Sequence, residues 1–154
     1  MGYSTDFVGG FNITPVLSQK DNEFLTRFSE TRRMARDVGP EYGIQGEFYV
    51  DGTGYAGQDR DSTVIDYNSP PSTQPGLWCQ WIPTEDGTRL VWDGGEKFYD
   101  YVEWLQYLID KILAPRGYTI TGTCEWQGED SDDFGKIVVT DNNVVVRLGR
   151  KTYD

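Results

Sequence analysis

Two stretches of the chain carry apolar residues at helical spacing. In the first, Ser18 can cap a helix that continues through Phe24 and Phe28, and the arginines of FSETRRMAR are expected late in this helix, where they favour the negative end of its dipole. The second, GEKFYDYVEWLQYLIDKILAP, repeats apolar residues three and four positions apart and ends near Pro115. Burying its apolar side chains at about 1.5–3 kcal/mol each makes this helix a structural element first.

The remaining apolar positions predict short strands separated by turns. The candidates are residues 3–13, 46–50, 63–67, 77–82, 88–92, 118–126, 136–139 and 144–148. TEDGT and TDNN are typical of hairpin turns, because Asp, Asn and Gly tolerate the positive φ that such turns need. The pattern therefore predicts an α+β fold, a two-layer sandwich in which two helices lie on one face of a mostly antiparallel sheet.

The two halves of the chain show the same order of predicted elements. Residues 1–68 and 76–148 each read as strand, helix, strand, an acidic G-x-D-x-D loop and strand, and the proline-rich segment 69–75 links them. Chance recurrence of a short motif and internal duplication both explain this order. Duplication predicts that the loops GQDRD and GEDSD occupy equivalent places about a pseudo-twofold axis, within a single domain of residues 1–154. It also allows homodimers through sheet edges.

Charge and cysteine content narrow the classes of partner. The 154 residues carry a formal net charge of −11, which disfavours direct binding to nucleic acid or to an anionic membrane and suits a basic protein or plain solubility. Cys79 and Cys124 are too few for a disulfide framework and too isolated for a zinc site, so both are predicted to be buried free thiols. No apolar run is long enough to span a bilayer, and the predicted location is cytoplasmic.

The acidic loops supply six candidate binding residues: Asp59, Asp61, Glu129, Asp130, Asp132 and Asp133. An EF-hand is excluded because Phe134 and Asp141 stand where ligands are required, and the flanks are strands; a looser carboxylate site for Ca²⁺ or Mg²⁺ stays open. The chain has no histidine, no G-x-S-x-G motif and no Walker A loop, so enzymatic activity is disfavoured and no catalytic residue, metal or cofactor is assigned. The loops can accept hydrogen bonds from arginines of a partner, or be solvated turns.

The segment LWCQW adds aromatic candidates. In a strand, Trp78 and Gln80 would lie on one face and Trp81 on the other. A tryptophan on each face suits a central strand covered on both sides, and it also suits a ligand or partner surface. Trp78, Gln80 and Trp81 are therefore candidate binding residues beside the acidic loops.

Five motifs carry a likeness to other proteins: MGYSTDF, FSETRRM, PGLWCQW, GGEKFY and WQGEDSDDFG. With these motifs the chain resembles a family of small, acidic, uncharacterised proteins of phages and bacteria. The likeness spans most of the chain, and the segment DVGPEYGIQGEF departs from it. It implies a cytoplasmic, phage-encoded or bacterial protein, and it transfers no activity, cofactor or catalytic residue.

Two functions follow as expectations. The first is a non-enzymatic acidic binding protein, such as a phage accessory protein, that engages a basic host protein through its acidic loops and exposed aromatic residues. The second is a small-ligand-binding protein or an unrecognised enzyme, with Trp78, Gln80, Trp81 and nearby acids lining a pocket. A flat acidic face favours the first, and a deep aromatic pocket favours the second.

Overall fold

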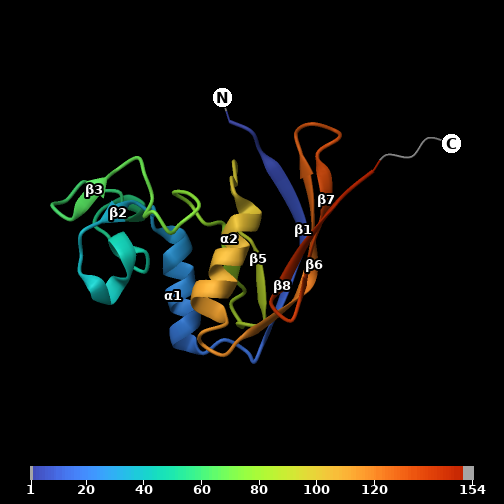
Figure 1. The fold of residues 1–154 in the computed structure, drawn as a ribbon, viewed down its shortest axis with the longest axis horizontal. Coiled ribbons are helices and arrows are strands. Elements are labelled where there is room, and N and C mark those ends of the chain that lie inside the picture. The colour runs from blue at the N-terminus through green and yellow to red at the C-terminus, as the bar shows by residue number, and fades with distance from the viewer. Residues whose placement is uncertain (1, 151–154) are drawn as a thin grey trace.

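A six-stranded antiparallel sheet dominates the computed structural model, which describes residues 2–150 (Figure 1). Met1 and residues 151–154, which the single-domain prediction includes, lie outside the described residues. The strands, in their order across the sheet, are β4 (Trp81–Pro83), β5 (Arg89–Trp92), β1 (Thr5–Thr14), β6 (Thr119–Gly128), β7 (Phe134–Thr140) and β8 (Asn143–Leu148). Every neighbouring pair is antiparallel. The predicted α+β fold is confirmed.

Two helices cover one face of this sheet, as predicted (Figure 1). Helix α1 (Gln19–Glu30) begins after Ser18, whose hydroxyl accepts a hydrogen bond from the backbone N–H of Asp21 at 3.1 Å. Helix α2 (Tyr101–Leu108) continues into a π-helical turn at Ile109–Leu113. It starts later than its apolar pattern predicts, because Lys97 and Asp100 have φ of 58° and 57°, which a right-handed helix cannot contain. Neither helix is long and apolar enough to cross a membrane, over the residues described.

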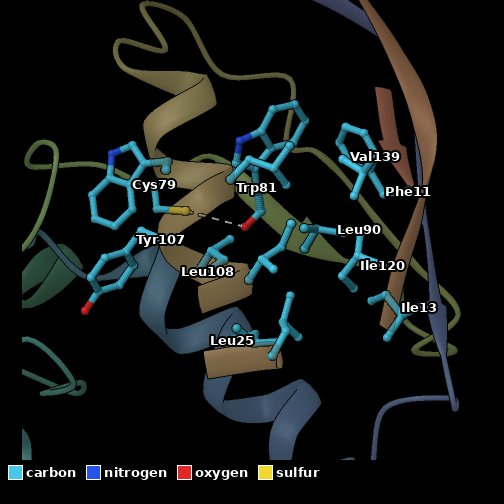
Figure 2. Close-up of a cluster of buried hydrophobic side chains, with 14 of the residues drawn as sticks. Phe11, Ile13, Leu25, Cys79, Trp81, Leu90, Tyr107, Leu108, Ile120 and Val139 are labelled. Atoms are coloured by element: carbon cyan, nitrogen blue, oxygen red, sulfur yellow. Dashed lines mark hydrogen bonds between the residues drawn. The ribbon is translucent and has the colours of Figure 1, made fainter. Parts of the chain in front are cut away.

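The core lies between the helices and the sheet (Figure 2). Alternate residues of β1 and β6, among them Phe7, Phe11 and Ile120, point from the sheet towards the helices. Trp81 is 1% exposed; it packs edge-on against Phe7 and Phe11, with ring centres 5.4 and 5.6 Å away. Its indole N–H donates to the carbonyl of Tyr101 at 2.8 Å. Trp81 is thus a core residue. The sequence suggested it as a binding residue, but its side chain does not reach the surface.

Both cysteines are buried and unpaired, as predicted. Burial raises the pKa of the Cys79 thiol to about 12 and that of the Cys124 thiol to about 11. Both thiols are therefore protonated, weak nucleophiles at neutral pH.

Residues 35–75 form a separate layer on the side of the helices opposite the sheet, which we call the lobe (Figure 1). Its regular elements are the two-stranded sheet β2 (Ala35–Arg36) and β3 (Val64–Asp66), and the 3₁₀ turns η1 (Pro40–Tyr42), η2 (Ile44–Gly46) and η3 (Tyr55–Gly57). The strand predicted over 46–50 was wrong: η2 and the turn after it occupy this segment. The strand predicted over 77–82 forms only from Trp81 onward.

The two halves of the chain do not occupy equivalent places. From residues 1–68 only β1 enters the six-stranded sheet, whereas the other five strands come from residues 76–148. GQDRD starts at the last residue of η3, in the lobe, whereas GEDSD starts at the last residue of β6 and belongs to the turn between β6 and β7, at one end of the sheet (Figure 1). The pseudo-twofold relation that duplication predicts for the acidic loops is therefore not seen.

Candidate binding cleft

A cleft of about 790 Å³ lies where the lobe meets the helical layer and the sheet edge. We call it the lobe cleft. It is bordered by the last turns of α1, by lobe residues 51–58, by the segment from Trp78 to Pro83, and by Asp93 at the end of β5. The volume falls within the range of about 300–1,000 Å³ that is usual for ligand sites.

Arginines that follow α1 hold the lobe side of this cleft in place. The sequence pattern placed them in the last helical turn, but α1 ends at Glu30. Arg33, 2% exposed, donates from Nη2 to the carbonyls of Glu47 and Tyr49 at 3.1 and 2.6 Å. Burial lowers the pKa of Arg33 to about 10, which leaves it charged at neutral pH. The guanidinium is stabilised by carbonyl dipoles and by the Phe28 ring, whose centre is 4.1 Å from Cζ.

Arg36 holds the segment that carries GQDRD. Its Nη2 donates to the carbonyl of Gly57 at 2.8 Å, and its Nη1 donates to Asp61 at 3.3 Å and to Thr63 at 3.0 Å. Hydrogen bonds from the hydroxyl and N–H of Thr63, and the nearby Arg36, lower the pKa of Asp61. Gly57 has φ of 62° and lies so close to Thr31 that a Cβ would sit 3.0 Å from its methyl carbon. Asp61 is thus part of the internal support of the lobe.

Trp78 and Gln80 form the opposite wall, and both were predicted as binding residues. The Gln80 side chain is fixed at both ends: its Oε1 accepts from the indole of Trp92 at 3.1 Å, and its Nε2 donates to the carbonyl of Glu96 at 2.8 Å. Trp78 is half-buried, with its ring centre 6.0 Å from the guanidinium carbon of Arg32. These contacts hold one aromatic and one amide side chain at the cleft wall.

Carboxylates predominate among the charged groups of the cleft. Glu30, Asp51 and Asp93 line it, and Arg27 is the one cation among the described lining residues. Arg27 pairs with Asp51 at 3.3 Å, with both side chains more than half exposed. Asp93 is an exposed residue, but its carboxyl is partly shielded from water, and this raises the pKa of Asp93. The N–H of Gly95, which donates to this carboxyl at 2.7 Å, acts in the opposite direction.

The other acidic candidates do not line the cleft. Asp59 is exposed and its carboxylate lies against Gly54 in the lobe. The remaining four, Glu129, Asp130, Asp132 and Asp133, belong to the turn between β6 and β7.

Glu129 and Asp133 of this turn accept hydrogen bonds from other segments of the molecule. Asp133 accepts hydrogen bonds from the hydroxyl of Tyr3 at 2.7 Å and from the indole of Trp126 at 2.9 Å. Glu129 accepts from the backbone N–H of Ser4 at 2.8 Å. The acidic turn therefore ties the start of β1 to the β6–β7 hairpin, and Asp133 is a structural residue.

The structure thus brings together Trp78 and Gln80 from the predicted set and joins them to Glu30, Asp51 and Asp93, which the sequence did not indicate. Isolated acids at helix ends and in loops give no signal of a shared cleft. Within residues 2–150, no group of three or more Cys, Asp or Glu side chains is placed to hold a metal ion. Comparisons of the chain with family models, curated proteins and solved structures gave no match.

Proposed function

We propose that the chain is a non-enzymatic binding protein whose lobe cleft receives a cationic group of a basic partner protein. The observation that carries this proposal is the meeting of Trp78 with the carboxylates of Glu30, Asp51 and Asp93 around one open cleft. Guanidinium and ammonium groups bind carboxylates through charge-assisted hydrogen bonds and stack on aromatic faces. An arginine or lysine side chain therefore matches both kinds of group that the cleft offers.

The charge of the whole chain supports the same class of partner. A net charge of −11 attracts basic proteins and accelerates their encounter at low salt. The resemblance to phage and bacterial proteins makes a nucleic-acid-binding protein of a bacterium the partner class to test first, because its surface is already basic. A phage accessory protein that occupies such a surface would compete with nucleic acid for it.

The test is calorimetric titration with a hexa-arginine peptide, with hexa-citrulline as the uncharged control. Two variants remove three negative charges each: Glu30→Gln/Asp51→Asn/Asp93→Asn in the cleft, and Glu129→Gln/Asp130→Asn/Asp132→Asn on the β6–β7 turn. Three exposed ion pairs of about 0.2–1 kcal/mol each amount to about a three- to hundred-fold rise in Kd for the cleft variant. Because general electrostatic attraction falls equally in both variants, a matching loss in the turn variant, or a greater one, would refute the proposal.

The cleft volume supports a second candidate, a small cationic ligand bound without a protein around it. Titration with arginine amide separates the two. Binding of arginine amide as tight as that of the peptide favours a small-molecule site, whereas a gain in affinity with the peptide favours a protein partner.

A further inference from the structure

Strand β8 forms one edge of the sheet, and within residues 2–150 no strand pairs with its outer side. Its sequence NVVVRL contains no proline, and Arg147 is its one charged residue. Val145, Val146 and Leu148 are exposed by 40%, 43% and 78%. Natural sheet edges are usually protected by charge, by proline or by a covering element. The opposite edge strand, β4, follows this rule: it contains Pro83 and contacts α1.

The hydrogen-bond register shows which backbone groups of β8 are free. Gly149 N donates to the carbonyl of Phe134 at 2.8 Å, and Asn143 lies opposite Thr140. Since bonded and non-bonded positions alternate along an antiparallel strand, β7 takes the backbone groups of Val145 and Arg147. The N–H and C=O groups of residues 144, 146 and 148 therefore point away from the sheet.

We propose that a second copy of this chain adds to β8 in antiparallel register, about a twofold axis at Val146. This register sets Val146 opposite its own counterpart and Val144 opposite Leu148 of the second copy. Each outward N–H and C=O of these three residues then gains a partner. On the same face, Val146 then contacts Val146 of the second copy, and Leu148 contacts Val144 of the second copy, so the exposed side chains form cross-strand apolar pairs. The two six-stranded sheets become continuous, with both helical layers on one face.

Charges at the two ends of this pairing are complementary. The register places Arg150 beside Asn142 and next to Asp141 of the second copy, and both charged side chains are exposed. Arg147 lies opposite Val145, so like charges are not placed directly across from each other. Residues 142–150 contain no carboxylate, which makes this edge a place where two acidic chains can approach. An unrelated extended peptide could use the same amides, but it would not be present in the purified protein.

Sedimentation analysis of the purified chain tests the pairing. The wild type is expected at about twice the 17.5 kDa of one chain. Val146→Pro removes an outward N–H that β7 does not use, so the variant is expected to fold and to run as a monomer. Val8→Lys is the control, because Val8 is 71% exposed on β1, away from this edge, and it should remain dimeric. A monomeric wild type at every concentration, or a dimeric Val146→Pro, would overturn the proposal.

A crosslinking measurement does not depend on the proline variant. The two copies of residue 146 form a hydrogen-bonded pair with Cα atoms about 5.5 Å apart, within disulfide range. The two copies of residue 145 are offset by two positions, at about 8 Å, beyond that range. Val146→Cys should therefore oxidise to a covalent dimer, and Val145→Cys should not, since Cys79 and Cys124 are buried. Equal crosslinking of both variants, or of neither, would contradict the register.

Discussion

Replacing Arg33 with methionine tests whether buried arginines hold the lobe against the helices. Arg33 is 2% exposed, and its Nη2 donates to two lobe carbonyls at 3.1 and 2.6 Å. A third bond, from Nη1 to the carbonyl of Phe28, is long at 3.4 Å. Methionine keeps most of the apolar stem and removes every donor. The lobe would therefore lose its hydrogen bonds from the Arg33 side chain without a large cavity being opened.

The magnitude follows from the groups left behind. The Tyr49 carbonyl loses its partner inside the protein, which costs about 1–3 kcal/mol. The Glu47 carbonyl keeps the hydrogen bond that Nε2 of Gln74 donates to it at 2.6 Å. Removing the guanidinium returns part of the cost of burying a charge, so the net loss is no more than about 1–3 kcal/mol. For a chain of 154 residues, where about 1 kcal/mol shifts Tm by 2–4 °C, the melting temperature should fall by about 2–12 °C.

Urea unfolding followed by circular dichroism measures the loss, and hydrogen exchange locates it. The matched control is Arg27→Met, because Arg27 reaches Asp51 of the lobe only through an exposed ion pair, so this variant should lose no more than about 1 kcal/mol. Faster exchange in Arg33→Met should be concentrated in residues 47–57. Surface substitutions alone change the free energy of unfolding by up to about 0.5 kcal/mol. If the free energies of unfolding of the two variants differ by no more than this, Arg33 does not hold the lobe.

Three further predictions concern single groups. Both cysteines should react with a thiol reagent at least about a hundred-fold more slowly in the native state than in urea, because their raised pKa and burial suppress the thiolate; fast labelling of either thiol would contradict the core packing. Asp133→Ala should lower the free energy of unfolding by about 1–3 kcal/mol, since it leaves a tyrosine and a tryptophan donor unpaired, whereas Asp130→Ala should change it by less than about 0.5 kcal/mol. Hydrogen bonds from two threonine hydroxyls lower the pKa of Asp86 from 3.8 to about 2. The wild type should therefore be more stable than Asp86→Ala at neutral pH, and this difference in stability should disappear as the pH falls from 3.8 towards 2. A difference that grows in acid would refute the assignment.

Much of the sheet and both helices could be predicted because their signals are local. Alternation of Phe7, Phe11 and Ile13 with polar or small residues marks β1, and Ser18 marks the start of α1. The turn residues Asp141 and Asn142, both with positive φ, link β7 and β8 as expected. Each of these features depends on residues within one element or one turn.

The lobe and the cleft could not be predicted because they depend on distant contacts. From the sequence, arginines near the end of a helix suggest only an interaction with the helix dipole. In the structure, Arg33 and Arg36 are buried because they donate hydrogen bonds to the carbonyls of residues 47, 49 and 57, which are distant in the sequence. Alternation showed that Trp78 and Trp81 point to opposite sides, but not which side is buried. The carboxylates of the cleft come from three segments that the fold alone brings together.

The most direct test of the cleft as the cation site is the position of indole signals in ¹⁵N NMR spectra during titration with hexa-arginine. Trp78 lines the cleft, whereas the indole of Trp126 donates to Asp133 at the acidic turn, so the two signals report on the two competing sites. We expect the Trp78 signal to shift and saturate with the calorimetric Kd while the Trp126 signal stays in place. A shift of Trp126 with Trp78 unchanged would move the binding site to the β6–β7 turn and contradict the account.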